Sequence, residues 1–259
     1  MPLLVEDVGA VRVLTLSNPS KRNALTRALL DELRAALPAA PSFDAQPVRV
    51  VILRGDPAGA CFSAGYDISA IDEAEKDAGL DPICAPADAL EACPVPVIAA
   101  IDGACMGGAF ELAMACTLRI AETSAKLAMP PARLGLVYSA SGLQRFLRAA
   151  TPSTVQRIFL TGARIDGADA QRQGLIDLAV EPGRAFDEAR ALAEQIAENA
   201  PLAVAGLLDA IRRASRPGGP TTEDVAAIDA ARLRTVASAD LAEGVAALLE
   251  KRAPVFRGR

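Results

Sequence analysis

One stretch of this chain, residues 94–116, constrains the fold more than any other. It begins with an apolar, β-branched run over residues 94–101, which predicts a buried strand. A turn of small residues that contains Gly107 and Gly108 follows, and the next segment is apolar on nearly all sides, which predicts a buried helix. A buried strand that leads directly into a buried helix is typical of layered α/β folds.

Glu111 is the one charged side chain of this predicted helix. A carboxylate loses its hydration there, which is costly unless it finds a partner or binds a proton. Glycines at a helix start let a ligand approach the backbone, and free N–H groups there stabilise developing negative charge. The stretch therefore predicts an anion-stabilising hole with an acid–base group beside it. The alternative is that the glycines only allow close packing and that Glu111 forms a cap or a local salt bridge.

A second junction of the same kind follows an apolar strand predicted over residues 48–54. Residues 61–68 read Cys-Phe-Ser-Ala-Gly-Tyr-Asp-Ile and again lead from a strand toward a predicted helix. The backbone N–H of Tyr66 can then face the same ligand as the turn at Gly108. Two junctions of one design predict a repeating α/β core, although glycine is common in any strand-to-helix turn.

Composition excludes several classes of function. The chain has 259 residues, a net charge of −5 and only 3% aromatic residues, so it offers neither a basic field nor a stacking platform for nucleic acid. No apolar run reaches the roughly 18 residues that span a bilayer, so we expect no membrane segment. The five cysteines lack metal-ligand spacing, and we expect them to be core residues of a cytoplasmic protein without a metal site.

The chain contains no histidine. This excludes Ser-His-Asp and Cys-His catalysis and most zinc sites. Acid–base chemistry must then rest on carboxylates, tyrosine, lysine, cysteine or water.

Hydrophobic periodicity and turn signals predict the other elements. Residues 3–6 and 11–16 should form a hairpin, and Thr26 should cap a helix that continues to residue 37. No helix or strand is predicted over the polar, proline-interrupted segment 73–89, which is expected to be mobile. Short strands are predicted at residues 118–121 and 126–129, and helices at 142–149, 153–160, 167–173 and 186–199.

Two regions bear on ligands and assembly. Lys21 and Arg22 lie in a polar loop and suit a phosphate-bearing ligand, although an exposed cation pair is usually just solvated. From residue 201 the chain reads as consecutive amphipathic helices, over 202–214, 222–235 and 241–251. We therefore divide the chain into a core over residues 1–200 and a helical, oligomerising region over residues 201–259.

Four segments together resemble the enoyl-CoA hydratase/isomerase (crotonase) family. They are residues 18–25, 62–68, 103–112 and 134–135, in the family's order and at its spacings, and the resemblance covers essentially the whole chain. It implies an α/β fold, a crotonase-like spiral of ββα turns with a C-terminal helical trimerisation region. It also implies an acyl-CoA thioester substrate, no cofactor apart from the CoA of the substrate, and assembly as a homotrimer or a dimer of trimers.

The resemblance also assigns the site. The backbone N–H groups of Tyr66 and Gly108 would form the oxyanion hole for the thioester carbonyl. The positions that match the CoA site are Lys21, Arg22, Ala24, Ala64 and Asp67, with Lys251 and Phe256 expected to help cover it.

The chain departs from the hydratases of the family at one position. These enzymes use two glutamates, one matching Glu111 and one at the position of Pro131. Syn addition of water needs one group to take a proton from water and another to handle the proton at the α-carbon. Proline can do neither, so either another group substitutes or hydration is not the main activity.

The segments around Glu111 and Tyr138 and residues 250–256 most resemble the methylmalonyl-CoA decarboxylase branch, in which a glutamate and a tyrosine match these two positions. Decarboxylation forms the enolate without a base. We therefore expect decarboxylation of a methylmalonyl-CoA-like thioester by a lyase, in which Glu111 positions the substrate carboxylate or a proton-delivering water and Tyr138 orients or protonates. A purely structural role is the alternative for Tyr138. Enoyl-CoA hydration, enoyl-CoA isomerisation and non-catalytic acyl-CoA binding are the alternative functions.

Overall fold

Strands β3 (Val50–Gly55) and β4 (Val97–Ile101) form the centre of the main sheet. The structure is a computed structural model that describes residues 3–39, 48–67, 69 and 81–259. Five of the six residues of β3 and all five of β4 are buried, as expected of parallel strands that are covered on both faces. The full order of the sheet is β1, β2, β3, β4, β6, β9. The other four strands, two on each side of this pair, are β1 (Leu3–Val8), β2 (Val11–Leu16), β6 (Leu118–Glu122) and β9 (Leu178–Val180).

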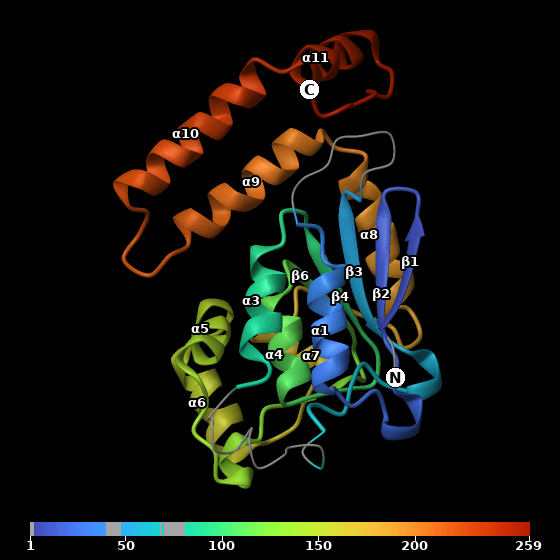
Figure 1. Cartoon of the computed structure of the whole chain (residues 1–259), viewed down its shortest axis with the longest axis vertical. Helices are drawn as coiled ribbons and strands as arrows, with labels where there is room; N and C mark the ends of the chain where they lie inside the picture. Colours follow the sequence, from blue (N-terminus) through green and yellow to red (C-terminus); the bar gives the residue numbers. More distant parts are fainter. Residues whose placement is uncertain (1–2, 40–47, 68, 70–80) are drawn as a thin grey trace.

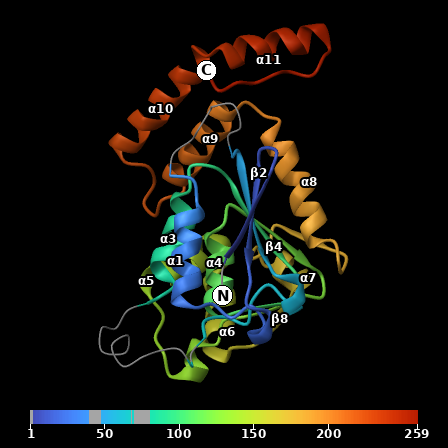
Figure 2. The same cartoon turned by 45° about the vertical axis from the view of Figure 1, so that its right-hand side comes forward.

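Two layers of helices cover this sheet, one on each face (Figures 1 and 2). Side chains of β2, β3, β4 and β6 that point to one face pack against Ala189 and Ala193 of α8 (Ala185–Ala197). The opposite face packs against α1 (Arg27–Ala36), α3 (Cys84–Ala92) and α4 (Gly108–Ala115). This second layer carries Glu111, so the candidate acid–base group lies within the larger of the two cores.

A small second sheet continues the strand-to-helix junctions. Strand β5 (Ala104–Met106) pairs in parallel with β7 (Lys126–Ala128), which pairs with β8 (Ile165–Asp166). The chain then forms a short 3-10 turn, η4 (Pro131–Leu134), before three further helices. These are α5 (Ala140–Ala149), α6 (Pro152–Thr161) and α7 (Gly167–Arg172).

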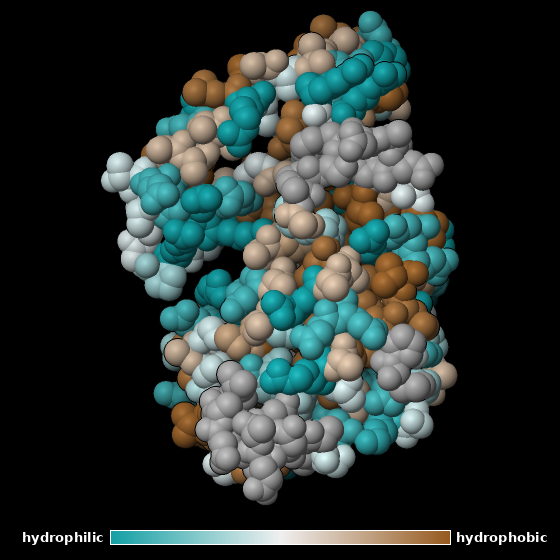
Figure 3. All heavy atoms as spheres, in the orientation of Figure 1, coloured by the Kyte–Doolittle hydropathy of each residue, from teal (hydrophilic) through white to brown (hydrophobic). Residues whose placement is uncertain are grey.

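Three helices at the C-terminal end extend away from the sheet (Figures 1 and 2). They are α9 (Pro201–Ala214), α10 (Thr222–Val236) and α11 (Ala239–Glu250). The guanidinium of Arg212 on α9 donates to the carbonyl of Cys93, at 2.8 Å, and so ties α9 to the end of α3. Large apolar side chains on these helices are exposed, namely Leu207, Ile211, Leu233, Val236, Leu241, Val245, Leu248 and Leu249. Hydrophobic residues accordingly interrupt the hydrophilic surface at this end of the molecule (Figure 3).

The prediction for residues 73–89 is wrong over its last six residues. Residues 84–89 begin helix α3. Pro86 is compatible with this helix because it lies in the first turn, where a proline removes no intrahelical hydrogen bond. The rest of that segment is outside the described residues apart from 81–83, as is the helix expected after residue 68. Strands β5, β8 and β9 are short and were not predicted.

Candidate active site

The two glycine turns meet in the structure. The backbone N–H of Ser63 donates to the carbonyl of Ala104, at 3.0 Å, and that of Met106 donates to the carbonyl of Ser63, at 3.1 Å. Gly65 has φ +98, and a Cβ placed on it would lie 2.7 Å from the Met106 carbonyl oxygen. Only glycine allows this conformation and this approach together, so the pairing of the two turns depends on it.

The predicted oxyanion-hole residues lie on these paired turns. Gly108 is the first residue of α4, so its N–H has no acceptor within the helix. The segment around Tyr66 is held like a strand beside Leu25, whose N–H donates to the carbonyl of Gly65 and whose carbonyl accepts from the N–H of Asp67, both at 2.8 Å. The structure thus brings together the backbone segments that sequence reasoning chose.

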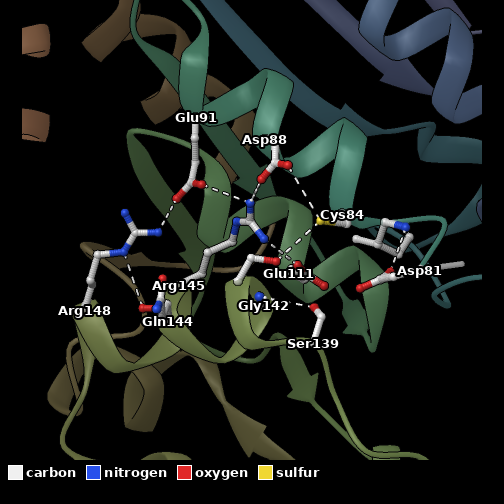
Figure 4. A network of polar contacts seen from close by, with 12 residues as sticks. Asp81, Cys84, Asp88, Glu91, Glu111, Ser139, Gly142, Gln144, Arg145 and Arg148 are labelled. Carbon is white, nitrogen blue, oxygen red and sulfur yellow. Dashed lines mark hydrogen bonds and ion pairs between the residues drawn. The ribbon is translucent and has the colours of Figure 1, made fainter. Parts of the chain in front are cut away.

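Glu111 is fully buried, and both of its carboxylate oxygens have a partner. Oε1 accepts a hydrogen bond from Nη1 of Arg145, at 2.8 Å, and Oε2 accepts one from the hydroxyl of Tyr138. Figure 4 shows Glu111 on α4 and Arg145 on α5 facing one another. Glu111 therefore does form a salt bridge, as the sequence left open, but its partner is not local: Arg145 lies 34 residues further along the chain, on α5.

Burial and hydrogen bonding act on Glu111 in opposite directions. Burial raises the pKa of Glu111 above its ordinary value, whereas the hydrogen bond from Tyr138 and the charge of Arg145 lower it. The negative charge of Asp81, which is also labelled in Figure 4, raises the pKa of Glu111 further. Burial and the Glu111 charge also raise the pKa of Tyr138, so its hydroxyl keeps its proton.

Gly142 makes room for this cluster. A Cβ at this position would lie 2.5 Å from the ring of Tyr138 and 3.0 Å from Oε1 of Glu111. The ring of Tyr138 packs edge-on against that of Phe159, with centroids 5.4 Å apart. Sequence reasoning missed Gly142 and Arg145. The available signal was an arginine beside Phe146 on the apolar face of the predicted helix, where a charged side chain is unusual.

Pro131 lies buried in η4, and its side chain brings only hydrocarbon. Its carbonyl accepts hydrogen bonds from the N–H groups of Gly135 and Leu136 and so closes the turn that leads to Tyr138. The residue at the position that the resemblance assigns to the hydratases' second glutamate thus shapes the loop and offers no group for proton transfer.

The positions predicted for the CoA site divide into two groups. Nζ of Lys21 forms an ion pair with Oδ2 of Asp67, at 2.7 Å, which lowers the pKa of Asp67. The carbonyl of Arg22 accepts from the N–H of Ala64, at 3.0 Å, and Ala24 is buried in the same loop. The structure therefore brings together five of the predicted residues, namely Lys21, Arg22, Ala24, Ala64 and Asp67.

Lys251 and Phe256 are not brought to that cluster within one chain. Lys251 ends helix α11, and the ring of Phe256 lies 3.4 Å from the position of a Cβ on Gly244 of the same helix. The carbonyl of Phe256 accepts from Arg49, at 3.1 Å. The expected cover over the CoA site stays a prediction.

The described residues contain neither a cluster of metal-binding side chains nor a membrane-spanning helix. No three Cys, Asp or Glu side chains among them converge on a point that would hold a metal ion. In the same part of the chain, no helix is both long and apolar enough to cross a membrane.

Known proteins similar to this chain share its whole length. A family model described as enoyl-CoA hydratase/isomerase matches residues 6–259. A probable enoyl-CoA hydratase of Bacillus subtilis is 35% identical over 96% of this chain and 95% of its own length. The methylmalonyl-CoA decarboxylase of Escherichia coli is 30% identical over 98% of this chain and 97% of its own. A crystal structure of an enoyl-CoA hydratase from Bacillus anthracis has a TM-score of 0.88 and 30% identity, covering 99% of both chains. The chain therefore belongs to the enoyl-CoA hydratase/isomerase family and has its crotonase-like fold.

Proposed function

We propose that this protein is an enzyme that acts on an acyl-CoA thioester through an enolate, and that its main reaction is the decarboxylation of a methylmalonyl-CoA-like substrate. One observation carries the proposal. Both oxygens of Glu111 are engaged, by Arg145 and Tyr138. In addition, the family resemblance puts Pro131 at the position of the hydratases' second glutamate.

The chemistry of the enolate supports this choice. In decarboxylation the bond between the α-carbon and the carboxylate breaks, carbon dioxide leaves, and the electron pair moves onto the thioester oxygen. Two backbone donors, here Tyr66 N–H and Gly108 N–H, are typically worth about 3 kcal/mol each at such an oxygen. The step needs no general base, so the absence of a second carboxylate at position 131 does not obstruct it.

Reprotonation of the α-carbon completes the reaction. The raised pKa of Tyr138 keeps its hydroxyl protonated, and its hydrogen bond to Oε2 fixes its orientation. We assign to Glu111 the positioning of the substrate carboxylate or of a proton-delivering water, and to Tyr138 the orientation or delivery of the proton. The decarboxylase among the relatives gives independent support.

Hydration is the second candidate, and a specific observation favours it. The negative charge of Asp81 acts on both Glu111 and Tyr138, so a second carboxylate is near the site although it is not at position 131. Other relatives carry the names enoyl-CoA hydratase and, in Mycosarcoma maydis, enoyl-CoA isomerase/hydratase. Isomerisation would use Glu111 alone. Non-catalytic binding is disfavoured, because it gives no reason to keep a buried carboxylate beside two glycine turns.

Substrate binding and assembly follow from the same proposal. Lys21 and Arg22 would face the phosphates of CoA, with Ala24, Ala64 and Asp67 lining the site, and no further cofactor is needed.

The exposed apolar side chains of α10 and α11 support a homotrimer or a dimer of trimers. The five unpaired cysteines support a reducing, cytoplasmic location.

The test is to incubate the purified protein with methylmalonyl-CoA and crotonyl-CoA together and to follow the product masses. We expect loss of carbon dioxide from the first thioester without addition of water to the second. Addition of water to crotonyl-CoA with methylmalonyl-CoA intact would reject decarboxylation in favour of hydration, and Asp81→Asn would then show whether Asp81 supplies the second carboxylate.

A further inference from the structure

Arg145 is a buried cation that sequence reasoning did not single out. It lies on α5, and its side chain is 1% exposed. Its guanidinium reaches Glu111 on α4 through Nη1, and through Nη2 it contacts Asp88 and Glu91 on α3, the latter at 3.0 Å. Burying a guanidinium is costly unless carboxylates compensate its charge, and here three of them do so.

The geometry gives the two oxygens of Glu111 different roles. Arg145 takes Oε1, so Oε2 is left to the hydroxyl of Tyr138. A carboxylate that is bonded at both ends cannot rotate. If Arg145 were absent, Oε1 would be buried without a partner, and burial would drive Glu111 toward its neutral form.

We propose that Arg145 is the positioning residue of the active site: it fixes the Glu111 carboxylate in one orientation and keeps it ionised, while Asp88 and Glu91 set how strongly it does so. The inference rests on the proposed role of Glu111 in turnover. It adds a link from the site to the surface, because the side chain of Asp88 is 60% exposed and that of Glu91 is 30% exposed.

Among the described residues, charged groups from several elements surround this link. Tyr138 and Asp81 face Glu111, in addition to Arg145. Asp88 and Glu91 of α3 face Arg145, and Arg148, one turn further along α5, binds the other oxygen of Glu91, at 2.6 Å. Arg148 therefore belongs to the link, whereas Arg190 forms an exposed ion pair with Glu194 on α8 and serves as the control.

The first experiment compares Arg145→Gln and Arg145→Lys with Arg190→Gln as the control. Turnover of the preferred thioester is measured against pH. We expect Arg145→Gln to lower kcat at neutral pH by about tenfold or more, with KM changed far less, because each unit of pKa rise at Glu111 lowers its ionised fraction tenfold once the pKa exceeds the assay pH. The acidic limb of the profile should move to higher pH. Arg145→Lys should recover part of the loss, and Arg190→Gln should match the unaltered protein.

The second experiment keeps the proposal testable if Arg145→Gln does not fold. Asp88→Asn combined with Glu91→Gln changes only partly exposed side chains, and it frees Arg145 to act on Glu111 alone. The acidic limb should then move in the opposite direction, to lower pH. A purely structural Arg145 would leave the limb in place in both variants, and that result would overturn the proposal.

A third readout separates this inference from the proposed function. Carbon-13 NMR of protein labelled in its glutamate side-chain carboxyls, with Glu111→Gln for assignment, follows the titration of Glu111 without any turnover. We expect its midpoint to rise in Arg145→Gln and to fall in the Asp88→Asn, Glu91→Gln variant. An unchanged midpoint rejects the role of Arg145, whereas a shifted midpoint in a protein that decarboxylates nothing rejects only the proposed reaction.

Discussion

At the scale of single residues, the site depends on a carboxylate that is buried and yet fully hydrogen-bonded. Glu111 lies in the first turn of α4, where the helix dipole favours a negative charge, and Arg145 and Tyr138 satisfy its oxygens. These interactions offset the cost of burial only in part, since the pKa of Glu111 remains raised. A group held in this balance is typical of a functional site.

Replacing Glu111 by glutamine should therefore abolish most of the turnover. Glu111 is proposed to position the water that returns a proton to the α-carbon. Assisted proton transfer contributes roughly 100-fold or more to rate, so we expect Glu111→Gln to lower kcat by about that factor while CoA binding is retained. Two quantities are measured, the rate of product formation and the affinity for CoA. Glu194→Gln, which alters an exposed ion pair with Arg190 on α8, is the control. Wild-type turnover in Glu111→Gln would remove this residue from the mechanism.

At the scale of elements, two arrangements hold neighbouring segments of the chain together. The first is the contact between the glycine turns, which requires Gly65 at φ +98 against the Met106 carbonyl. The second is the link between α9 and α10, in which Asp224 accepts from the N–H and hydroxyl of Thr221 and pairs with Arg213 and Arg216.

Gly65→Ala should damage both activity and stability. Its Cβ would meet the Met106 carbonyl oxygen, so the two turns must separate. Gly9→Ala is the matched control, because Gly9 also has a positive φ but open space around it, and there we expect only the conformational cost of about 1–2 kcal/mol. Chemical denaturation and the rate of turnover measure the two effects. Equal losses of stability and full activity in both variants would contradict the proposed packing of the turns.

Asp224 should make stability depend on pH in the acid range. The backbone and hydroxyl of Thr221 and the guanidinium of Arg213 lower the pKa of Asp224 to about 2, from an ordinary value of 3.8. A lowered folded-state pKa stabilises the fold above pH 3.8, and this contribution is lost as the pH falls toward 2. Asp224→Asn should therefore melt at a lower temperature than the unaltered protein at neutral pH, and the difference should shrink below pH 3.8. A difference that is constant with pH would be inconsistent with this assignment.

At the scale of the whole molecule, the C-terminal helices bury little of their apolar surface within one chain. Leu248 and Leu249 on α11 are each 79% exposed, and monomeric proteins rarely expose a cluster of such residues. The surface is accounted for if further copies of the chain cover it, as the proposed trimer requires.

Leu248→Glu combined with Leu249→Glu should therefore dissociate the assembly. Buried charges in an apolar interface are unfavourable, so we expect a smaller species by size-exclusion chromatography with light scattering. Leu160→Glu is the control, because Leu160 on α6 is also exposed but lies away from these helices. A monomeric unaltered protein, or a double variant of unaltered size, would reject this interface.

Local sequence was enough to predict most of the elements. The apolar runs at β3, β4 and α4 are buried on all sides, so each was evident from composition over a few residues. Caps were equally direct, because the hydroxyl of Thr26 accepts from the N–H of Leu29 as expected at a helix start. The prediction for residues 84–89 was wrong because Pro86 was given the weight of a helix breaker, although it is compatible with a first turn.

The sequence by itself determined that a buried carboxylate follows a glycine turn and that a second such turn exists. It also determined that the chain has no histidine and that position 131 holds proline, not glutamate. Periodicity and residue chemistry are local, and they are sufficient for these statements. Only the tertiary structure decided what surrounds Glu111. The arginine that binds it is 34 residues away, and the carboxylates that balance that arginine are 54 and 57 residues away on another helix. Contacts at such separations depend on how helices pack over the sheet, which no local pattern of residues encodes.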